Sequence, residues 1–205
     1  MNTTITAIIF DFGNVLVNWD ARNLYKRFFP DLGAVDRFLE EIRFAEWNAR
    51  QDAGRPFREG VRELSSRFPQ YATLIQAYDT HWEESITGTN DETIDIARQL
   101  KHAGWTLYLL SNFSVEKFEL IRGQHHFLEI FDEMIISGEY NLVKPDPAIF
   151  HLTLKRINRT AQECLFIDDS LANIETAKRI GFQAIHYQSP TQLVRELKNL
   201  SIHGI

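Results

Sequence analysis

The most informative stretch of the chain is Ala7-Ile8-Ile9-Phe10-Asp11-Phe12-Gly13-Asn14-Val15-Leu16, in which an apolar run ends abruptly at a carboxylate. A short apolar run before a turn residue is typical of a buried strand, which we predict over 5–10. If this strand lies inside a parallel sheet, Asp11 comes to the carboxyl edge of that sheet, where open α/β sheets bind their ligands. Other candidate site residues can therefore be judged by whether they reach the same edge.

The composition of the 205-residue chain is that of a globular protein, with 44% hydrophobic and 24% charged residues. This length suits one domain, or one domain with a small insertion. The net charge of −6 argues against nucleic acid or an anionic membrane as a partner, but it allows a small anionic ligand. The single cysteine, Cys164, permits no internal disulfide, and we find no secretory signal and no membrane-spanning apolar run. We therefore expect a cytoplasmic protein, either a monomer or a weak homodimer.

Helical spacing of apolar residues dominates from Asp20 to about Ser85, without a convincing strand. Breaks between short helices are expected at Pro30, Gly33, residues 54–56 and Pro69. We interpret this region as a helical insertion with a small core of its own.

Beyond Gly88 the pattern alternates between helices and strands. We predict helices over 91–103, 115–124, 147–157, 171–180 and 191–197, strands over 105–110, 134–137, 164–167 and 182–187, and a loop over 138–144. Asp146 is the expected N-cap of the helix that begins at Pro147. Such alternation implies a parallel sheet with right-handed crossovers. The expected fold class is therefore α/β, a Rossmann-like three-layer parallel sheet core with an inserted α-helical segment.

The acidic pair Asp168-Asp169 follows a predicted strand, as Asp11 does. Carboxylates gathered at one edge would repel one another, and a divalent cation relieves that repulsion. Carboxylate oxygens and a backbone carbonyl, such as that of Gly13, suit Mg²⁺. The alternative is that the pair caps the helix that begins at Leu171. Asp11 itself is either a solvated strand end or a nucleophile that forms an aspartyl-phosphate.

Three further polar residues lie in loops that leave predicted strands. Ser111 and Asn112 could donate to a phosphate oxygen beside a helix N-terminus, although capping of the next helix is the simpler explanation. Lys144 could be an ordinary surface lysine. Because the rigid segment 145–147 follows it, Lys144 could instead point inward as a positive charge for phosphate.

The ordered set of these segments resembles the haloacid dehalogenase superfamily of hydrolases across nearly the whole chain. The matching segments are Asp11-Phe-Gly-Asn-Val-Leu16, Leu110-Ser-Asn112, Lys144-Pro-Asp-Pro147 and Phe166-Ile-Asp-Asp-Ser170. The resemblance implies a Rossmann-like core over 1–18 and 87–205, with an α-helical cap over 19–86. It also implies a phosphatase similar to the bacterial enzymes that act on sugar phosphates such as glucose 1-phosphate.

The resemblance further implies a chemistry for the matched residues. Asp11 would be the nucleophile, and Mg²⁺ would be held by Asp11, the Gly13 carbonyl and Asp169, with Asp168 bound directly or through water. Asn173, on the helical face that follows Asp169, would support these metal ligands.

The phosphate of a small phosphorylated metabolite would be bound by Ser111, Asn112 and Lys144, according to the same resemblance. Substrate choice would then depend on the cap. The cap residues that we single out as candidates to face the site are Asp20, Arg22, Trp47 and Asn48, although cap packing and surface exposure explain them equally well.

Position 13 departs from the family pattern. Phosphatases of this family usually carry a second aspartate two residues after the nucleophile, as general acid and base, and here that residue is Gly13. Loss of a general acid typically costs about 10²–10⁴-fold in rate. We therefore expect a slow enzyme, or one that favours easy leaving groups, or one in which a group from the cap substitutes.

Three other interpretations compete with the phosphatase. In a dehalogenase of the same superfamily, Asp11 would attack a carbon atom and no Mg²⁺ would be needed. This interpretation does not explain the acidic pair. A receiver-like signalling module also combines aspartates with a lysine, but it carries its acidic pair on the first strand. A catalytically weak phosphate-binding or regulatory protein would be compatible with Gly13, whereas the retained Asp11 and Lys144 argue against it.

Overall fold

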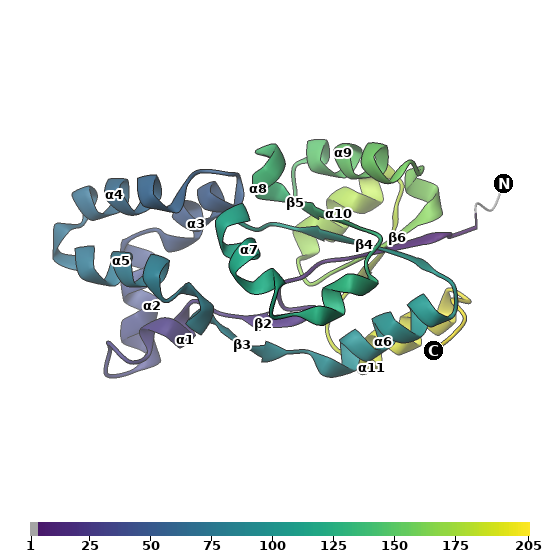
Figure 1. The fold of residues 1–205 in the computed structure, drawn as a ribbon, viewed down its shortest axis with the longest axis horizontal. Coiled ribbons are helices and arrows are strands. Elements are labelled where there is room, and N and C mark those ends of the chain that lie inside the picture. The colour runs from purple at the N-terminus through teal and green to yellow at the C-terminus, as the bar shows by residue number, and fades with distance from the viewer. Residues whose placement is uncertain (1–3) are drawn as a thin grey trace.

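The computed structural model describes residues 4–205 and contains a five-stranded sheet with the strand order β5-β4-β1-β6-β7 (Figure 1). The strands are β1 (Ala7–Phe10), β4 (Thr106–Ser111), β5 (Glu133–Ile136), β6 (Cys164–Asp168) and β7 (Gln183–His186). All four neighbouring pairs run parallel, and β1 is central, with Phe10 in register with Leu109 on β4 and Ile167 on β6. The α/β fold expected from the sequence is therefore confirmed.

Helices cover both faces of the sheet, which makes three layers. On β1, Ile8 and Phe10 join the apolar cluster of α6 (Asp91–His102) and α11 (Pro190–Asn199). Ala7 and Ile9 join the cluster of α9 (Pro147–Ile157) and α10 (Leu171–Ile180) on the opposite face. Because successive side chains of a strand point to opposite faces, a strand buried on both sides must be apolar throughout, as β1 is.

Local signals begin or end several of these helices where the sequence predicts. The carboxylate of Asp146 accepts a hydrogen bond from the Ala148 N–H at 2.8 Å and so caps α9. Gly181 ends α10 with φ at 109°, in the left-handed region that favours glycine. The remaining elements of this part are α7 (Val115–Arg122), α8 (Ser137–Tyr140) and the short 3₁₀ turns η3 (His126–Ile130) and η4 (Ala161–Glu163).

The helices of the insertion lie together at the left of Figure 1, beside the carboxyl edge of the sheet. They are α1 (Arg22–Tyr25), α2 (Leu32–Glu41), α3 (Phe44–Asp52), α4 (Phe57–Arg67) and α5 (Ala72–Thr80), with the 3₁₀ turns η1 (Pro69–Tyr71) and η2 (Trp82–Ser85). Their core is aromatic, since the ring of Tyr78 lies 4.8 Å from that of Phe44 and 5.8 Å from that of Trp47. We call residues 22–85 the helical segment, and its status as a separate cap domain over 19–86 stays a prediction.

Two local predictions were wrong, and two short strands were missed. Two strands that the sequence analysis missed, β2 (Val17–Trp19) and β3 (Ile86–Thr89), form an antiparallel ribbon that links the helical segment to the sheet. Gly33 does not break a helix but lies inside α2, whose start is fixed by Asp31 accepting from the Ala34 N–H at 2.8 Å. The predicted loop 138–144 begins inside α8, a single helical turn. The strands β2 and β3 and the helix α8 have at most four residues each, so they carry little periodicity of their own.

Within residues 4–205, no helix has the length and apolar character needed to cross a membrane.

Candidate active site

Except for the fully buried Asp168, the polar residues predicted to share an edge line one cavity at the carboxyl ends of β4, β1 and β6. The volume of this cavity, which we call the edge cavity, is about 290 Å³. Its lining consists of Asp11, Gly13, Asn14, Ser111, Asn112, Lys144, Pro145, Asp169, Ser170 and Asn173. The parallel pairing of the three strands explains this convergence, because their carboxyl ends meet at one edge.

Lys144 lies at the centre of the charged groups. Its Nζ is 2.8 Å from Asp11 Oδ1, 2.7 Å from Asp168 Oδ2 and 2.9 Å from the carbonyl oxygen of Leu110. The side chain is only 1% exposed. Burial disfavours the charged form of Lys144, but the two carboxylates outweigh it and raise the pKa of the lysine. Lys144 is therefore a buried, charged group and not a surface lysine.

The side chain of Asn112 holds the backbone of Lys144. Its Oδ1 accepts from the Lys144 N–H at 2.7 Å, and its Nδ2 donates to the Lys144 carbonyl at 2.8 Å. The N-cap position of α7 is occupied by Ser114, so neither Ser111 nor Asn112 caps that helix. The capping alternative is therefore wrong. Asn112 instead ties the loop of Lys144 to the end of β4.

Asp168 is completely buried, and both of its oxygens have protein partners. Oδ1 accepts from the Ser170 N–H at 2.8 Å, and Asn173 Nδ2 lies 2.9 Å from Oδ1 and 3.0 Å from Oδ2. Asn173 is thus hydrogen-bonded to Asp168, whereas its helical spacing had suggested Asp169 as the neighbour. Lys144 Nζ also donates to Oδ2, so the carboxylate of Asp168 holds the lysine in place.

The residues at this edge fit a divalent cation. Asp11, Asp168 and Asp169 each offer a carboxylate oxygen, and the three atoms lie within 4.8 Å of one another. Burial, opposed by Lys144 and reinforced by Asp168, raises the pKa of Asp11 to about 7. Burial and Asp168 also raise the pKa of Asp169. Burial and, to a lesser extent, repulsion between neighbouring carboxylates both disfavour the charged forms, and a bound cation would offset both effects.

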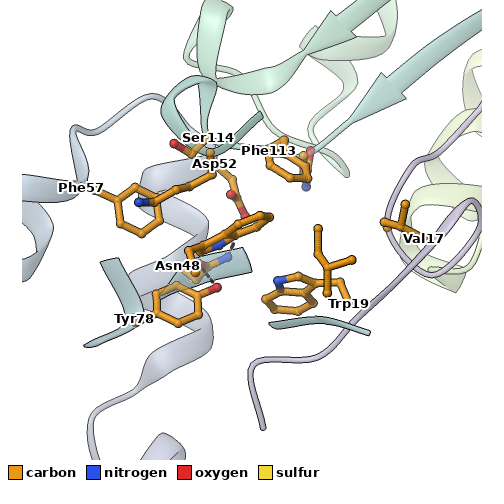
Figure 2. A pocket seen from close by; sticks show the side chains of 13 residues that line it. Val17, Trp19, Asn48, Asp52, Phe57, Tyr78, Phe113 and Ser114 are labelled. Carbon is orange, nitrogen blue, oxygen red and sulfur yellow. Dashed lines mark hydrogen bonds between the residues drawn. The ribbon is translucent and has the colours of Figure 1, made fainter. Parts of the chain in front are cut away.

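A second cavity, which we call the segment cavity, lies between the helical segment and the core (Figure 2). Its volume is about 100 Å³. Aromatic side chains form much of the wall, namely Trp19, Phe57, Tyr78, Trp82 and Phe113. Gly13 and Asn112 line both this cavity and the edge cavity, so the two adjoin.

Asp52, at the end of α3, is a carboxylate in the segment cavity that the sequence analysis missed (Figure 2). Its Oδ2 accepts from Asn48 Nδ2 at 3.0 Å, and the Tyr78 hydroxyl donates to Asn48 Oδ1 at 3.2 Å. Burial raises the pKa of Asp52 to about 7, although the backbone N–H of Ser114 opposes the shift. The spacing of four residues between Asn48 and Asp52 is the signal that places both on one helical face.

The four candidates proposed for the cap have different surroundings. Asn48 lines the segment cavity beside Asp52. Trp47 is 5% exposed and donates from Nε1 to the Gly60 carbonyl at 2.9 Å, so it packs within the helical segment. Asp20 and Arg22 pair with each other at 3.0 Å on the surface, with about two fifths of each side chain exposed. The packing alternative therefore describes Trp47, and the surface alternative describes Asp20 and Arg22.

Polar contacts dock the helical segment against α7 and α8. Lys117 Nζ donates to the carbonyl of Asp79 at 2.8 Å and to its carboxylate at 2.7 Å. The Ser137 hydroxyl donates to the carbonyl of Asp52. Gly54 lies so close that an added Cβ would be 2.7 Å from the Gly138 carbonyl oxygen. The segment cavity is therefore walled on one side by the helical segment and on the other by the core.

Comparison with known proteins gives a consistent result. Residues 5–181 match the sequence profile of a hydrolase family, the haloacid dehalogenase-like hydrolases. The chain is 26% identical to sesquiterpene phosphatase astK of Aspergillus oryzae, and the match covers 98% of each protein. It is 24% identical to D-ribitol-5-phosphate phosphatase of Bacteroides thetaiotaomicron, covering 94% of this chain and 97% of that enzyme. The chain also spans 36%, 19% and 32% of the length of three larger curated relatives.

The fold has a solved counterpart. A HAD family enzyme of Bacteroides thetaiotaomicron, determined in complex with magnesium and inorganic phosphate, superimposes with a TM-score of 0.71 at 20% identity. The superposition covers 90% of this chain and 95% of that one. At 20% identity, this superposition shows a similar fold and nothing further.

Proposed function

Because the chain belongs to the haloacid dehalogenase-like hydrolase family, we propose that it hydrolyses a small phosphate monoester through an aspartyl-phosphate on Asp11. The observation that carries the proposal is the buried contact of 2.8 Å between Lys144 Nζ and Asp11 Oδ1, beside two further aspartates. Asp11 is a carboxylate paired with one ammonium and placed near other carboxylates. Such a nucleophile can attack a phosphate dianion only when further positive charge is supplied.

The chemistry divides into two displacements. In the first, an Asp11 carboxylate oxygen attacks phosphorus, and the bond from phosphorus to the ester oxygen breaks. In the second, water attacks the phosphorus of the aspartyl-phosphate and regenerates the Asp11 carboxylate. Lys144 stays charged in its buried position and offsets the negative charge of the transferring group. Ser111, at the end of β4, lines the same cavity and offers a hydroxyl to a phosphate oxygen.

We propose that Mg²⁺ is held by Asp11, the backbone carbonyl of Gly13 and Asp169. Asp168 would take part through water, because its own oxygens already have protein partners. When bound, the cation supplies charge neutralisation and orientation of the phosphate. The donor set of carboxylate and carbonyl oxygens supports magnesium over softer metals, and the Bacteroides enzyme of the same fold was solved with magnesium and phosphate.

The body of the substrate would occupy the segment cavity, since this cavity adjoins the edge cavity at Gly13. Its aromatic walls and the polar Asn48 suit a small leaving group with both an apolar face and a hydroxyl. We propose a sugar phosphate as the first class to test. The two phosphatases similar to the chain are named for a sesquiterpene and for a ribitol phosphate, so the family alone does not fix the substrate.

The proposal is tested by phosphate release from a panel that includes 4-nitrophenyl phosphate, glucose 1-phosphate, glucose 6-phosphate and ribitol 5-phosphate. Each ester is assayed with Mg²⁺, with EDTA and with the Asp11→Asn variant. We expect release that requires both Mg²⁺ and Asp11. Absence of release from every ester, combined with EDTA-insensitive halide release from 2-haloacids, would instead establish the dehalogenase.

A further inference from the structure

Expulsion of an alkoxide from a phosphate ester requires a proton on the departing oxygen. Around the edge cavity, this proton has no obvious source. Asp11 acts as the nucleophile and Asp169 is assigned above to the cation. Lys144 is held by two carboxylates that raise its pKa, so it retains its proton. Residue 13, two positions after Asp11, is glycine and has no side chain to offer.

The space beside Gly13 is open. A Cβ added to this glycine would meet no atom within 4 Å, and Gly13 lines both the edge cavity and the segment cavity. A group bonded to a phosphate at Asp11 can therefore extend past Gly13 into the segment cavity. The departing oxygen of such an ester would lie at the junction of the two cavities, and the segment cavity beyond it is lined partly by side chains of the helical segment.

Asp52 is the carboxyl group among the described residues that line the segment cavity. Asn48 of the helical segment donates to its Oδ2 at 3.0 Å, and the Ser114 N–H of the core lowers the pKa of the same carboxyl. Its backbone carbonyl accepts from the Ser137 hydroxyl, which fixes the end of α3 against the core. Asp52 is thus a positioned group and not a mobile surface carboxylate.

We propose that Asp52 is the proton donor to the leaving-group oxygen, an inference that depends on the phosphatase activity proposed above. As Asp11 attacks phosphorus and the ester P–O bond breaks, the proton of the Asp52 carboxyl moves to the departing oxygen and yields the free alcohol. The resulting Asp52 carboxylate then takes a proton from the water that attacks the aspartyl-phosphate. This second step releases inorganic phosphate, regenerates the Asp11 carboxylate and returns Asp52 to its protonated form.

The surroundings keep Asp52 suited to this cycle. Burial raises its pKa to about 7, so the protonated and ionised forms are both accessible near neutral pH. The other titratable groups lining the same cavity are Tyr78 and Lys117. Burial raises the pKa of Tyr78 well above its usual value, and Lys117 is paired with Asp79. Tyr78 therefore keeps its proton near pH 7.

The test uses three esters of rising demand for protonation, namely 4-nitrophenyl, phenyl and butyl phosphate. The measured quantity is kcat/KM with Mg²⁺, because it reports the step that expels the leaving group. We expect Asp52→Asn to lower kcat/KM for butyl phosphate by about 10²–10⁴-fold and to lower that for 4-nitrophenyl phosphate far less. Asp79→Asn is the matched control, since it removes a contact between segment and core without touching Asp52 and should affect all three esters alike.

The pH dependence of the unmodified protein gives a second measurement that does not require the variant to fold. With butyl phosphate, kcat/KM should fall as the pH rises above about 7, because Asp52 loses its proton. With 4-nitrophenyl phosphate this fall should be absent. Equal losses for all three esters in Asp52→Asn, or identical pH profiles for the two esters, would overturn the role of Asp52 while leaving the phosphatase in place. Failure of the unmodified protein to release phosphate from any ester would overturn both.

Discussion

The side-chain amide of Asn112 binds both backbone polar groups of Lys144, accepting from its N–H at 2.7 Å and donating to its carbonyl at 2.8 Å. This pairing fixes the loop from which the lysine ammonium reaches Asp11. Asn112 is therefore a positioning residue, and its contribution to activity passes through Lys144.

Replacement of Asn112 by alanine should reduce both activity and stability. The variant leaves two buried backbone groups unpaired, at a cost of about 1–3 kcal/mol each. A misplaced lysine should lower kcat/KM by about 100-fold, equally for all phosphate esters, because it affects the phosphate and not the leaving group. Thermal melts and kinetics on two esters check both effects, with Asn199→Ala as an exposed asparagine control. A loss confined to one ester would contradict the positioning role.

Removal of the ammonium at position 144 should make stability depend on pH. In Lys144→Met, the carboxylates of Asp11 and Asp168 lose their shared counter-charge while staying buried. Leaving such charges uncompensated typically costs about 3–5 kcal/mol. We expect the full loss near pH 8 and a smaller loss near pH 5, where the Asp11 carboxyl, whose pKa burial raises to about 7, is protonated.

Denaturant unfolding in metal-free buffer at both pH values measures this difference, and Lys155→Met on the exposed side of α9 serves as control. A loss of the same size at pH 5 and pH 8 would mean that lost packing, and not uncompensated charge, destabilises the variant.

Much of the core of this site follows from the sequence, because two strong regularities apply to it. Strands buried on both faces must be continuously apolar, so β1 and β6 are visible as runs that end at Asp11 and Asp168. Parallel strands share one carboxyl edge, which brings these aspartates to Lys144. Both rules are local or follow from topology, and neither requires knowledge of loop packing.

What the sequence did not predict depends on contacts between distant segments. Asn112 acts on a loop that lies 32 residues away in the chain. The surroundings of Asp52 depend on the docking of α3 against α7. Neither contact leaves a periodic trace in the sequence. The ribbon of β2 and β3 was missed because two strands of three and four residues are too short for alternation to be recognised.

Asp52 should make the protein less stable as the pH rises from about 4 to 7. Its pKa is about 7 in the folded protein and about 3.8 in an exposed chain, so the folded state binds more protons between these values. The free energy of unfolding therefore falls with rising pH across this window, by an amount on the order of 4 kcal/mol. Asp52→Asn stays neutral and should escape this fall.

The quantity to measure is the difference in unfolding free energy between Asp52→Asn and the unmodified protein, at intervals from pH 4 to 8. This difference isolates Asp52 from Asp11 and Asp169, whose pKa values are also raised. The unfolding free energy of the variant should exceed that of the unmodified protein by an increasing amount up to about pH 7, and the difference should then level off. A difference that does not change with pH would show that Asp52 is ionised throughout.

A carboxyl group introduced at position 13 should substitute for Asp52. Because a Cβ at Gly13 would meet no atom within 4 Å, Gly13→Asp fits the junction of the two cavities without displacing a neighbour. In the Asp52→Asn background, we expect Gly13→Asp to raise kcat/KM for butyl phosphate by about tenfold or more, since it restores a proton donor beside the departing oxygen. The control is Gly13→Asn in the same background, which matches the aspartate in shape but donates no acidic proton. If both side chains at position 13 gave the same rate, the deficit of Asp52→Asn would lie in the shape of the cavity, and proton transfer at this junction would not limit the reaction.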